Sequence, residues 1–205
     1  GNVSFYNQSS DDGPVFPTPT IGMIGLIEKP EKQMTLDFKN EGDLIYLVGQ
    51  SQNDIASSEY LYSYRGIKAS PAPAFDLDEE FALQQAVGTL IEKQLIQSAH
   101  DLSDGGLFVA LAEAAMPRGL GFEITSMDDY RKDAFLFGEA QSRVLVSVSP
   151  EKQAEFQQIV GGTLKTPHAL LGKVTAKGFV VDGQTIVSSE EAKDLYDNSL
   201  GKIMA

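Results

Sequence analysis

The chain has 205 residues, of which 42% are hydrophobic and 22% charged, and its formal net charge is −13 at pH 7. This composition predicts a globular protein of one large or two small domains, and the acidic balance argues against nucleic acid or an anionic membrane as partner, because both require a basic surface. Because the chain has no cysteine, no apolar run near the roughly 18 residues of a membrane span and no leader pattern, we expect a cytoplasmic protein without disulfides or zinc–thiolate sites.

The first 70 residues combine turn-forming sequences with short apolar runs. They open on Gly-Asn-Val-Ser without a methionine, from which we expect part of a longer polypeptide. Residues 21–27, an apolar run with two glycines, predict a buried strand, and residues 44–49 predict a central strand. The prolines of residues 70–74 predict a domain junction, because they keep the chain extended.

After residue 70 the pattern alternates between helices and strands. Residues 78–96 carry apolar side chains at offsets 0, 4, 7 and 8 from Leu83, which is one face of a helix. A second helix begins after two glycines and ends near Pro117, and further helices are predicted at residues 150–160 and 190–204. Strands are predicted at residues 121–124, 142–148, 169–175, 179–181 and 185–187. The sequence therefore predicts an α+β or mixed α/β fold in two units, residues 1–70 and 71–205.

The segment from His100 to Leu107 carries the most informative chemistry. Ser103 or Asp104 can cap the first N–H groups of the following helix, and the next two glycines let a ligand approach the backbone. Free N–H groups at a helix start attract phosphate, and Asp101 and Asp104 are suited to Mg²⁺. The competing interpretation is a capped helix whose aspartates serve only the turn, and these residues alone favour it.

The two histidines favour structural roles. For His100 we expect a position at a strand end with a bond to a neighbouring backbone group rather than work as a general base. His168 is remote in sequence and follows a proline, so a zinc site is not expected.

A second polar segment runs from residue 135 to residue 143. A glycine precedes Glu139, Gln141 and Arg143 at the entrance to a strand, and these side chains can contact a polar ligand. Arg143 suits phosphate or carboxylate because its guanidinium is a planar fork. A turn with a structural Arg–Glu pair is the alternative.

Together these segments resemble the C-terminal part of the phosphoribosylformylglycinamidine synthases, which are formylglycinamide ribonucleotide amidotransferases. Gly-Asn-Val-Ser and His-Asp-x-Ser-Asp-Gly-Gly-Leu in one sequence form a fairly specific combination, and the resemblance runs through nearly the whole chain. The stretches that carry it are residues 1–7, 17–25, 99–107 and 136–143. A looser form of the second pattern also occurs in aminoimidazole ribonucleotide synthetase, thiamine-monophosphate kinase and selenophosphate synthetase.

The resemblance implies a fold and an activity. Residues 1–70 would be the tail of the second α/β nucleotide-binding domain, and residues 71–205 an α+β C-terminal domain of the aminoimidazole ribonucleotide synthetase-like superfamily. The activity implied is an ATP-dependent ligase of purine biosynthesis that makes formylglycinamidine ribonucleotide through an iminophosphate. The cofactors implied are ATP and Mg²⁺. The partners implied are formylglycinamide ribonucleotide, a glutaminase subunit or domain that supplies ammonia, and the N-terminal half of the same protein.

The resemblance also assigns residues. Gly1 looks like an ATP contact, Asn2 like a magnesium ligand and Ser4 like a substrate contact. Possible phosphate or nucleotide contacts of a second site are Asp101, Ser103, Asp104, Gly105, Gly106, Glu139, Gln141 and Arg143. The family's first half has Glu-Ser-Gln where this chain has Ala140 in the middle position. The family's catalytic histidines lie in the N-terminal half, so we expect no catalytic residue here and no synthetase activity of this chain alone.

Two other functions remain open at this point. One is a small-molecule kinase or dikinase of the same superfamily, against which the lack of cysteine and the Gly-Asn-Val-Ser segment count. The other is a non-catalytic module that binds a nucleotide, or nothing, for stability.

Overall fold

The computed structural model describes residues 9–10, 13–14 and 21–204, in two units, Gly1–Glu31 and Lys32–Ala205. In the first unit β1 (Ser9–Ser10) pairs antiparallel with β2 (Gly13–Pro14). Residues 21–27 were predicted to form a buried strand, but they form no strand, and Ile24 and Met23 are exposed. An apolar run forms a buried strand only where a neighbouring strand pairs with it, and none does so here among the described residues.

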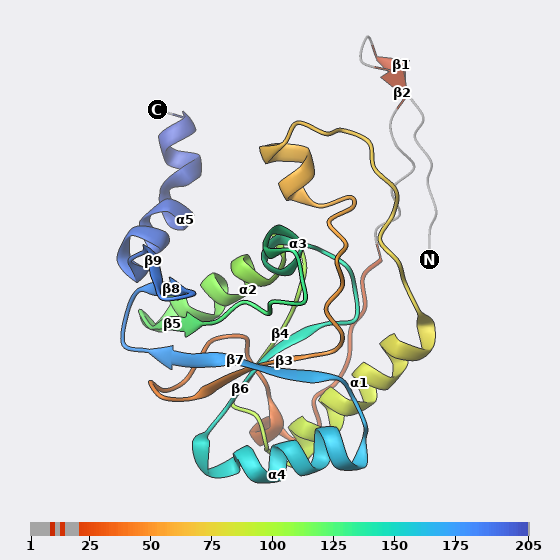
Figure 1. Ribbon diagram of the computed structural model, residues 1–205, viewed down its shortest axis with the longest axis vertical. Helices are drawn as coiled ribbons and strands as arrows, with labels where there is room; N and C mark the ends of the chain where they lie inside the picture. The colour runs from red at the N-terminus through yellow and green to blue at the C-terminus, as the bar shows by residue number, and fades with distance from the viewer. Residues whose placement is uncertain (1–8, 11–12, 15–20, 205) are drawn as a thin grey trace. The chain divides into compact units, whose positions relative to one another are not determined.

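The second unit is built around a seven-stranded sheet with the order β4-β6-β3-β7-β5-β8-β9 (Figure 1). The strand pairs are antiparallel except for β5 and β8, which are parallel. The strands are β3 (Leu44–Val48), β4 (Ser98–Asp101), β5 (Gly121–Ile124), β6 (Val144–Val148), β7 (His168–Thr175), β8 (Phe179–Val181) and β9 (Gln184–Val187).

Helices cover both faces of this sheet (Figure 1). In β3 the alternate residues Ile45 and Leu47 join the core that includes α2 and α3, whereas Tyr46 and Val48 join the core that includes α1 and α4. This alternation is the period of a strand, and it makes the unit a three-layer α+β fold. The helices are α1 (Leu77–Glu92), α2 (Gly106–Ala115), α3 (Lys132–Phe137), α4 (Gln153–Gln157) and α5 (Ser189–Met204).

The position of β3 changes the division of the chain. We predicted a boundary between residues 70 and 71, but β3 hydrogen-bonds to β6 on one side and to β7 on the other. Residues 32–70 therefore share one sheet and both cores with the rest of the second unit, and the prolines of residues 70–74 form a connection within it. That connection leads to Asp76, whose carboxylate caps α1 by accepting from the N–H groups of Asp78 and Glu79.

The remaining elements agree closely with the sequence pattern. The predicted strand at residues 44–49 and the helices starting near residues 78, 106 and 190 are present with ends shifted by a few residues. The pattern missed α3, which is short, and it gave no range for β4, although His100 was expected at a strand end. No helix within the described residues has both the length and the apolar character needed to cross a membrane.

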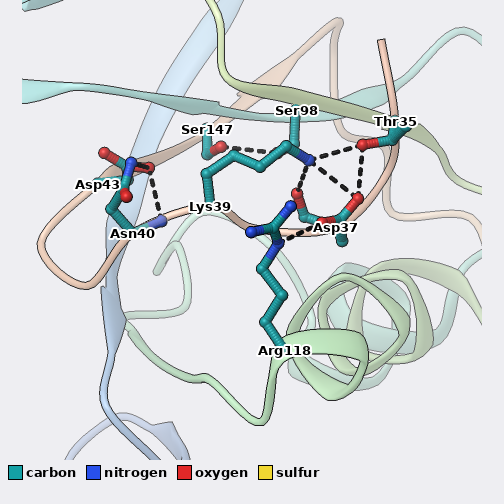
Figure 2. A network of polar contacts seen from close by, with 8 residues as sticks. All are labelled: Thr35, Asp37, Lys39, Asn40, Asp43, Ser98, Arg118 and Ser147. Atoms are coloured by element: carbon teal, nitrogen blue, oxygen red, sulfur yellow. Dashed lines mark hydrogen bonds and ion pairs between the residues drawn. The ribbon is translucent and has the colours of Figure 1, made fainter.

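A polar network fixes the segment before β3 (Figure 2). The Asp37 carboxylate accepts from Thr35 Oγ1 at 2.5 Å and lies 2.9 Å from Lys39 Nζ. Its second oxygen accepts from Arg118 Nε at 2.5 Å. Burial raises the pKa of Asp37, but the hydrogen bonds from these three side chains outweigh burial and hold the pKa well below its ordinary value. The network thus joins this segment to the residues that follow α2.

Asp37 should make stability depend on pH. Its pKa is lower in the fold than in the unfolded chain, so its charge stabilises the fold above about pH 4, and this contribution is lost as pH falls from there through the folded pKa. We expect Asp37→Asn to lower the free energy of unfolding by about 2 kcal/mol at neutral pH and to flatten its decline on acidification. Urea unfolding at a series of pH values measures both effects.

A matched control is Asp197→Asn, which removes only the exposed pair with Lys193 at 2.7 Å. It should change the free energy of unfolding by about 0.5 kcal/mol or less. An Asp37→Asn variant whose stability falls with acid as steeply as that of the unmodified chain would contradict the role given to this network.

Candidate functional site

A cavity of about 400 Å³ opens at the start of α2. The end of β4, the turn before α2 and the loop before β6 line it, together with two residues of α1. The cavity thereby brings together most of the residues predicted for a second site. Its lining residues are Glu80, Leu83, Asp101, Leu102, Ser103, Asp104, Glu139, Gln141, Ser142, Arg143 and Val144.

The two glycines at the start of α2 lie where a larger residue would clash. A Cβ on Gly105 would meet the side chain of Val109, and one on Gly106 would meet the backbone of the loop before β6. Gly105 has φ of 83° and Gly106 has φ of 67°, both in the region that favours glycine. A Cβ on Gly106 would lie 2.6 Å from the carbonyl oxygen of Gly138. The loop before β6 fills the space beside Gly106, and the expected approach of a ligand to the backbone of these glycines stays a prediction.

The cap of α2 comes from a distant carboxylate. Glu139 Oε1 accepts from the backbone N–H of Gly105 and from that of Glu59, each at 2.8 Å. The predicted cap by a side chain of Ser103 or Asp104 is absent, because Gly105 occupies the N-cap position of α2. Ser103 Oγ donates instead to Asp101 Oδ2 at 2.8 Å. A carboxylate therefore already lies at the helix start, where the helix dipole favours an anion.

Arg143 holds the loop before β6 from inside. It is 3% exposed, and its guanidinium donates to the carbonyl oxygens of Gly138, at 2.7 Å, and Ala140, at 2.9 and 3.1 Å. Burial lowers its pKa to about 10, while the nearby Asp54 opposes this shift, so the side chain stays charged at neutral pH. Among the described residues it makes no ion pair with Glu139, so the expected Arg–Glu pair is replaced by bonds to carbonyl groups.

The charge of the cavity favours cations. Four carboxylates line it, those of Glu80, Asp101, Asp104 and Glu139, against the single guanidinium of Arg143. The hydrogen bond from Ser103 lowers the pKa of Asp101, which keeps this carboxylate ionised at neutral pH. A bare phosphate would be repelled here, whereas a phosphate that carries a metal ion brings the positive charge that the carboxylates attract.

The carboxylates of the cavity suit Mg²⁺ only together with a phosphate group or water. The described residues contain no group of three or more His, Asp or Glu side chains placed to hold a metal ion by themselves. Mg²⁺ commonly binds one or two carboxylates and completes its shell with waters and phosphate oxygens. Asp101 and Asp104 suit such a site, in which two carboxylates share the metal ion with waters and phosphate oxygens.

The histidines have side-chain and backbone partners. His100 Nε2 lies 2.8 Å from Glu113 Oε2, and its Nδ1 lies 3.5 Å from Asp101 Oδ1. The expected bond to a neighbouring backbone group is thus replaced by a bond to a carboxylate of α2. His168 Nδ1 lies 3.1 Å from the carbonyl oxygen of Thr166, away from this cavity.

Sequence reasoning missed some residues of the site and placed others beyond the described part of the chain. Glu80 and Ser142 line the cavity, joined by a hydrogen bond from Ser142 Oγ to Glu80 Oε2 at 2.8 Å. Ser142 lies inside the polar segment of residues 135–143 but was not named as a contact, and no local signal pointed to Glu80, because the two meet only through the tertiary fold. The predicted contacts Gly1, Asn2 and Ser4 lie outside the described residues.

Comparison with known sequences shows which proteins this chain resembles. The model of the family described as "AIR synthase related protein, C-terminal domain" matches residues 40–183. The phosphoribosylformylglycinamidine synthase subunit PurL of Moorella thermoacetica is 46% identical over the whole chain, and that of Alkaliphilus metalliredigens is 39% identical. The chain spans 28% of the length of each of these two relatives.

Solved structures show the same fold. PurL of T. maritima complexed with FGAR matches 80% of this chain and 30% of its own, with a TM-score of 0.67 and 19% identity. Two further similar structures are that protein complexed with ATP and PurLQS from Thermotoga maritima. Thiamine-monophosphate kinase from Stenotrophomonas maltophilia matches 75% of the chain with a TM-score of 0.51 and 19% identity.

The close contact at Gly106 yields a stability prediction. We expect Gly106→Ala to lower the free energy of unfolding by about 2 kcal/mol or more, because φ is positive and the new methyl group meets the Gly138 carbonyl. The control Gly88→Ala lies within α1 with open space around it, and it should raise stability by about 0.5–1 kcal/mol. Urea unfolding of both variants measures these changes in the free energy of unfolding. Equal tolerance of the two substitutions would show that α2 does not require this contact.

Proposed function

The chain belongs to the family of AIR synthase related proteins, as their C-terminal domain, and on this premise we propose that it is the C-terminal part of a phosphoribosylformylglycinamidine synthase. The observation that carries the proposal is the 46% identity to such a synthase subunit along the whole chain. The kinase alternative is not favoured, because its support is a fold likeness at 19% identity.

The reaction proposed for the full-length protein is an ATP-dependent ligation. The formamide oxygen of formylglycinamide ribonucleotide attacks the γ-phosphorus of ATP, and ADP leaves. Ammonia then adds to the activated carbon, and phosphate leaves with the former formamide oxygen, which gives the amidine. Such phosphoryl transfer depends on positioning and on neutralising the charge of the transferred group. Mg²⁺ supplies this neutralisation when bound.

The other parts of the proposal concern residues outside this unit. We assign residues 1–31 to the end of the second nucleotide-binding domain, with Gly1 as ATP contact, Asn2 as magnesium ligand and Ser4 as substrate contact. The remaining length of the relatives, nearly three quarters, would supply the catalytic groups. A glutaminase partner, in a cytoplasmic complex, would supply ammonia from glutamine, and the PurLQS complex of T. maritima supports this assignment.

For the cavity at the start of α2 we propose a magnesium-bound phosphate group of a nucleotide as ligand. Asp101 and Asp104 would face the metal ion, because they are the carboxylates of the turn itself. Gln141 would offer an amide to a polar ligand from the opposite wall. The backbone turn of Ser103, Gly105 and Gly106, with Glu139 and Arg143, would keep the shape of the cavity. The ATP complex of the T. maritima protein supports a nucleotide as the ligand class.

The nucleotide proposal is tested by thermal unfolding with ADP. At a hundredfold excess over the dissociation constant, ligand binding adds about 2.7 kcal/mol to the free energy of unfolding, so Mg²⁺ and ADP together should raise the melting temperature. ADP with EDTA should give little or no rise, because the carboxylates repel a bare phosphate.

Two variants sharpen this measurement. Asp104→Asn should remove most of the rise, because Asp104 is proposed to face the metal ion. Asp128→Asn, an exposed aspartate outside the cavity lining, should leave the rise unchanged. A rise of the same size in EDTA, or none with millimolar Mg²⁺ and ADP, would refute this ligand.

The ligase proposal is tested by enzyme activity. The full-length protein with an ammonium salt should form ADP in proportion to formylglycinamide ribonucleotide consumed, whereas the 205-residue chain alone should form none above background. A coupled ADP assay with product detection measures this. Turnover by the isolated chain, or a full-length protein that phosphorylates the substrate without incorporating nitrogen, would contradict the proposal.

A further inference from the structure

A groove lies beside α5, away from the cavity at the start of α2. It has a volume of about 480 Å³ and separates α5 from the end of α2 and the turn that follows it. The His100–Glu113 pair forms its polar edge, with 2.8 Å between Nε2 and Oε2. Most of the remaining lining is apolar: Leu36, Met116, Pro117 and the ring of Tyr196.

The first turn of α5 packs against the rest of the second unit. Ser189 is buried, and its hydroxyl donates to the Leu120 carbonyl oxygen at 2.7 Å. Ala192 packs against the main core. Beyond it the helix extends away from the sheet toward the C-terminus (Figure 1). The apolar side chains of this extension are exposed, by 63% at Tyr196, 73% at Leu200 and 85% at Met204.

These exposed side chains form one stripe. Tyr196, Leu200 and Met204 follow each other at intervals of four residues, which places them on one face of the helix. Tyr196 lines the groove, so the stripe is continuous with it. Four charged side chains of α5 pair within the helix, Lys193 with Asp197 at 2.7 Å and Lys202 with Asp194 at 2.6 Å.

An apolar stripe of this kind requires a partner. Short helices in water are marginal without packing of their apolar face, and a large exposed apolar patch marks an interaction site. Permanent interfaces are more apolar than transient ones, so this exposed apolar surface favours a permanent partner. A permanent partner is available in the same polypeptide, because nearly three quarters of the length of the relatives lies outside the part that this chain matches.

We propose that the groove and the stripe of Tyr196, Leu200 and Met204 form one docking surface, which a segment from the preceding part of the same full-length polypeptide covers. The proposal rests on the proposed function only in that the chain is part of a longer synthase. The covering segment presents apolar side chains to Leu36 and Met116 and a polar group to Glu113. It thereby fixes α5 and, through it, the orientation of this unit toward the rest of the synthase.

The test is site-specific photo-cross-linking in the full-length protein. A benzophenone amino acid replaces Leu200 in one variant and Asn198 in a control, whose position two residues away does not share the stripe. The proposal predicts that the Leu200 variant forms a cross-link within one polypeptide, which mass spectrometry of the digest places before residue 1 of this chain. The control should give little of this product.

Each other outcome overturns the proposal. A cross-link between two copies would assign the surface to self-association, and one to a separate subunit would assign it to a partner protein. Absence of any cross-link at position 200 would show an uncovered stripe. The readout does not depend on ligase activity, so a cross-link in a protein without that activity would refute the proposed function and leave the docking surface standing.

Discussion

The candidate site depends on the hydrogen bonds that the Glu139 carboxylate accepts from two distant backbone N–H groups. One of its oxygens accepts from the N–H groups of Gly105 and Glu59, so it joins three segments that are far apart in the sequence. The join is possible only because the backbones touch: a Cβ on Gly106 would lie 2.6 Å from the Gly138 carbonyl oxygen, and one on Gly138 would lie 2.4 Å from the Asp54 carbonyl oxygen. The shape of the cavity follows from this contact, and its carboxylate lining follows from the segments that the contact brings together.

Charge then decides what the cavity can hold. Its guanidinium is buried and bound to carbonyl oxygens of the same loop, so it stabilises the wall. The carboxylates of Asp101 and Asp104 line the same cavity, and its excess of carboxylates selects a ligand that arrives with its own cation. The same aspartates in a site with free arginines would favour the opposite chemistry, a bare anion. The pattern His-Asp-x-Ser-Asp-Gly-Gly-Leu therefore forms the turn and supplies two carboxylates of the cavity. The loop around Glu139 adds a third carboxylate and the buried guanidinium.

Much of the fold was predictable because strands and helices of this chain carry clear periodicity. Residues 44–49 alternate between two cores, and α1 places Leu83 and Leu90 on its buried face. Two predictions were wrong because they depend on the tertiary fold. Residues 21–27 are apolar but form no strand. β3 lies in one sheet with β6 and β7, which no pattern before residue 70 reveals. For the site, the residues near Asp101 and Glu139 were predicted as two separate segments. Their contact, the cap by Glu139 and the participation of Glu80 depend on the tertiary fold.

The central claim is that the cavity at the start of α2 receives a metal-bound phosphate. Anomalous diffraction from crystals of the full-length protein grown with Mn²⁺ and ADP tests it most directly, because manganese replaces magnesium at oxygen ligands and scatters anomalously. The account predicts an anomalous peak next to Asp101 and Asp104 with phosphate density beside it. A cavity without such a peak, in crystals where manganese and ADP are bound elsewhere in the protein, would contradict the account.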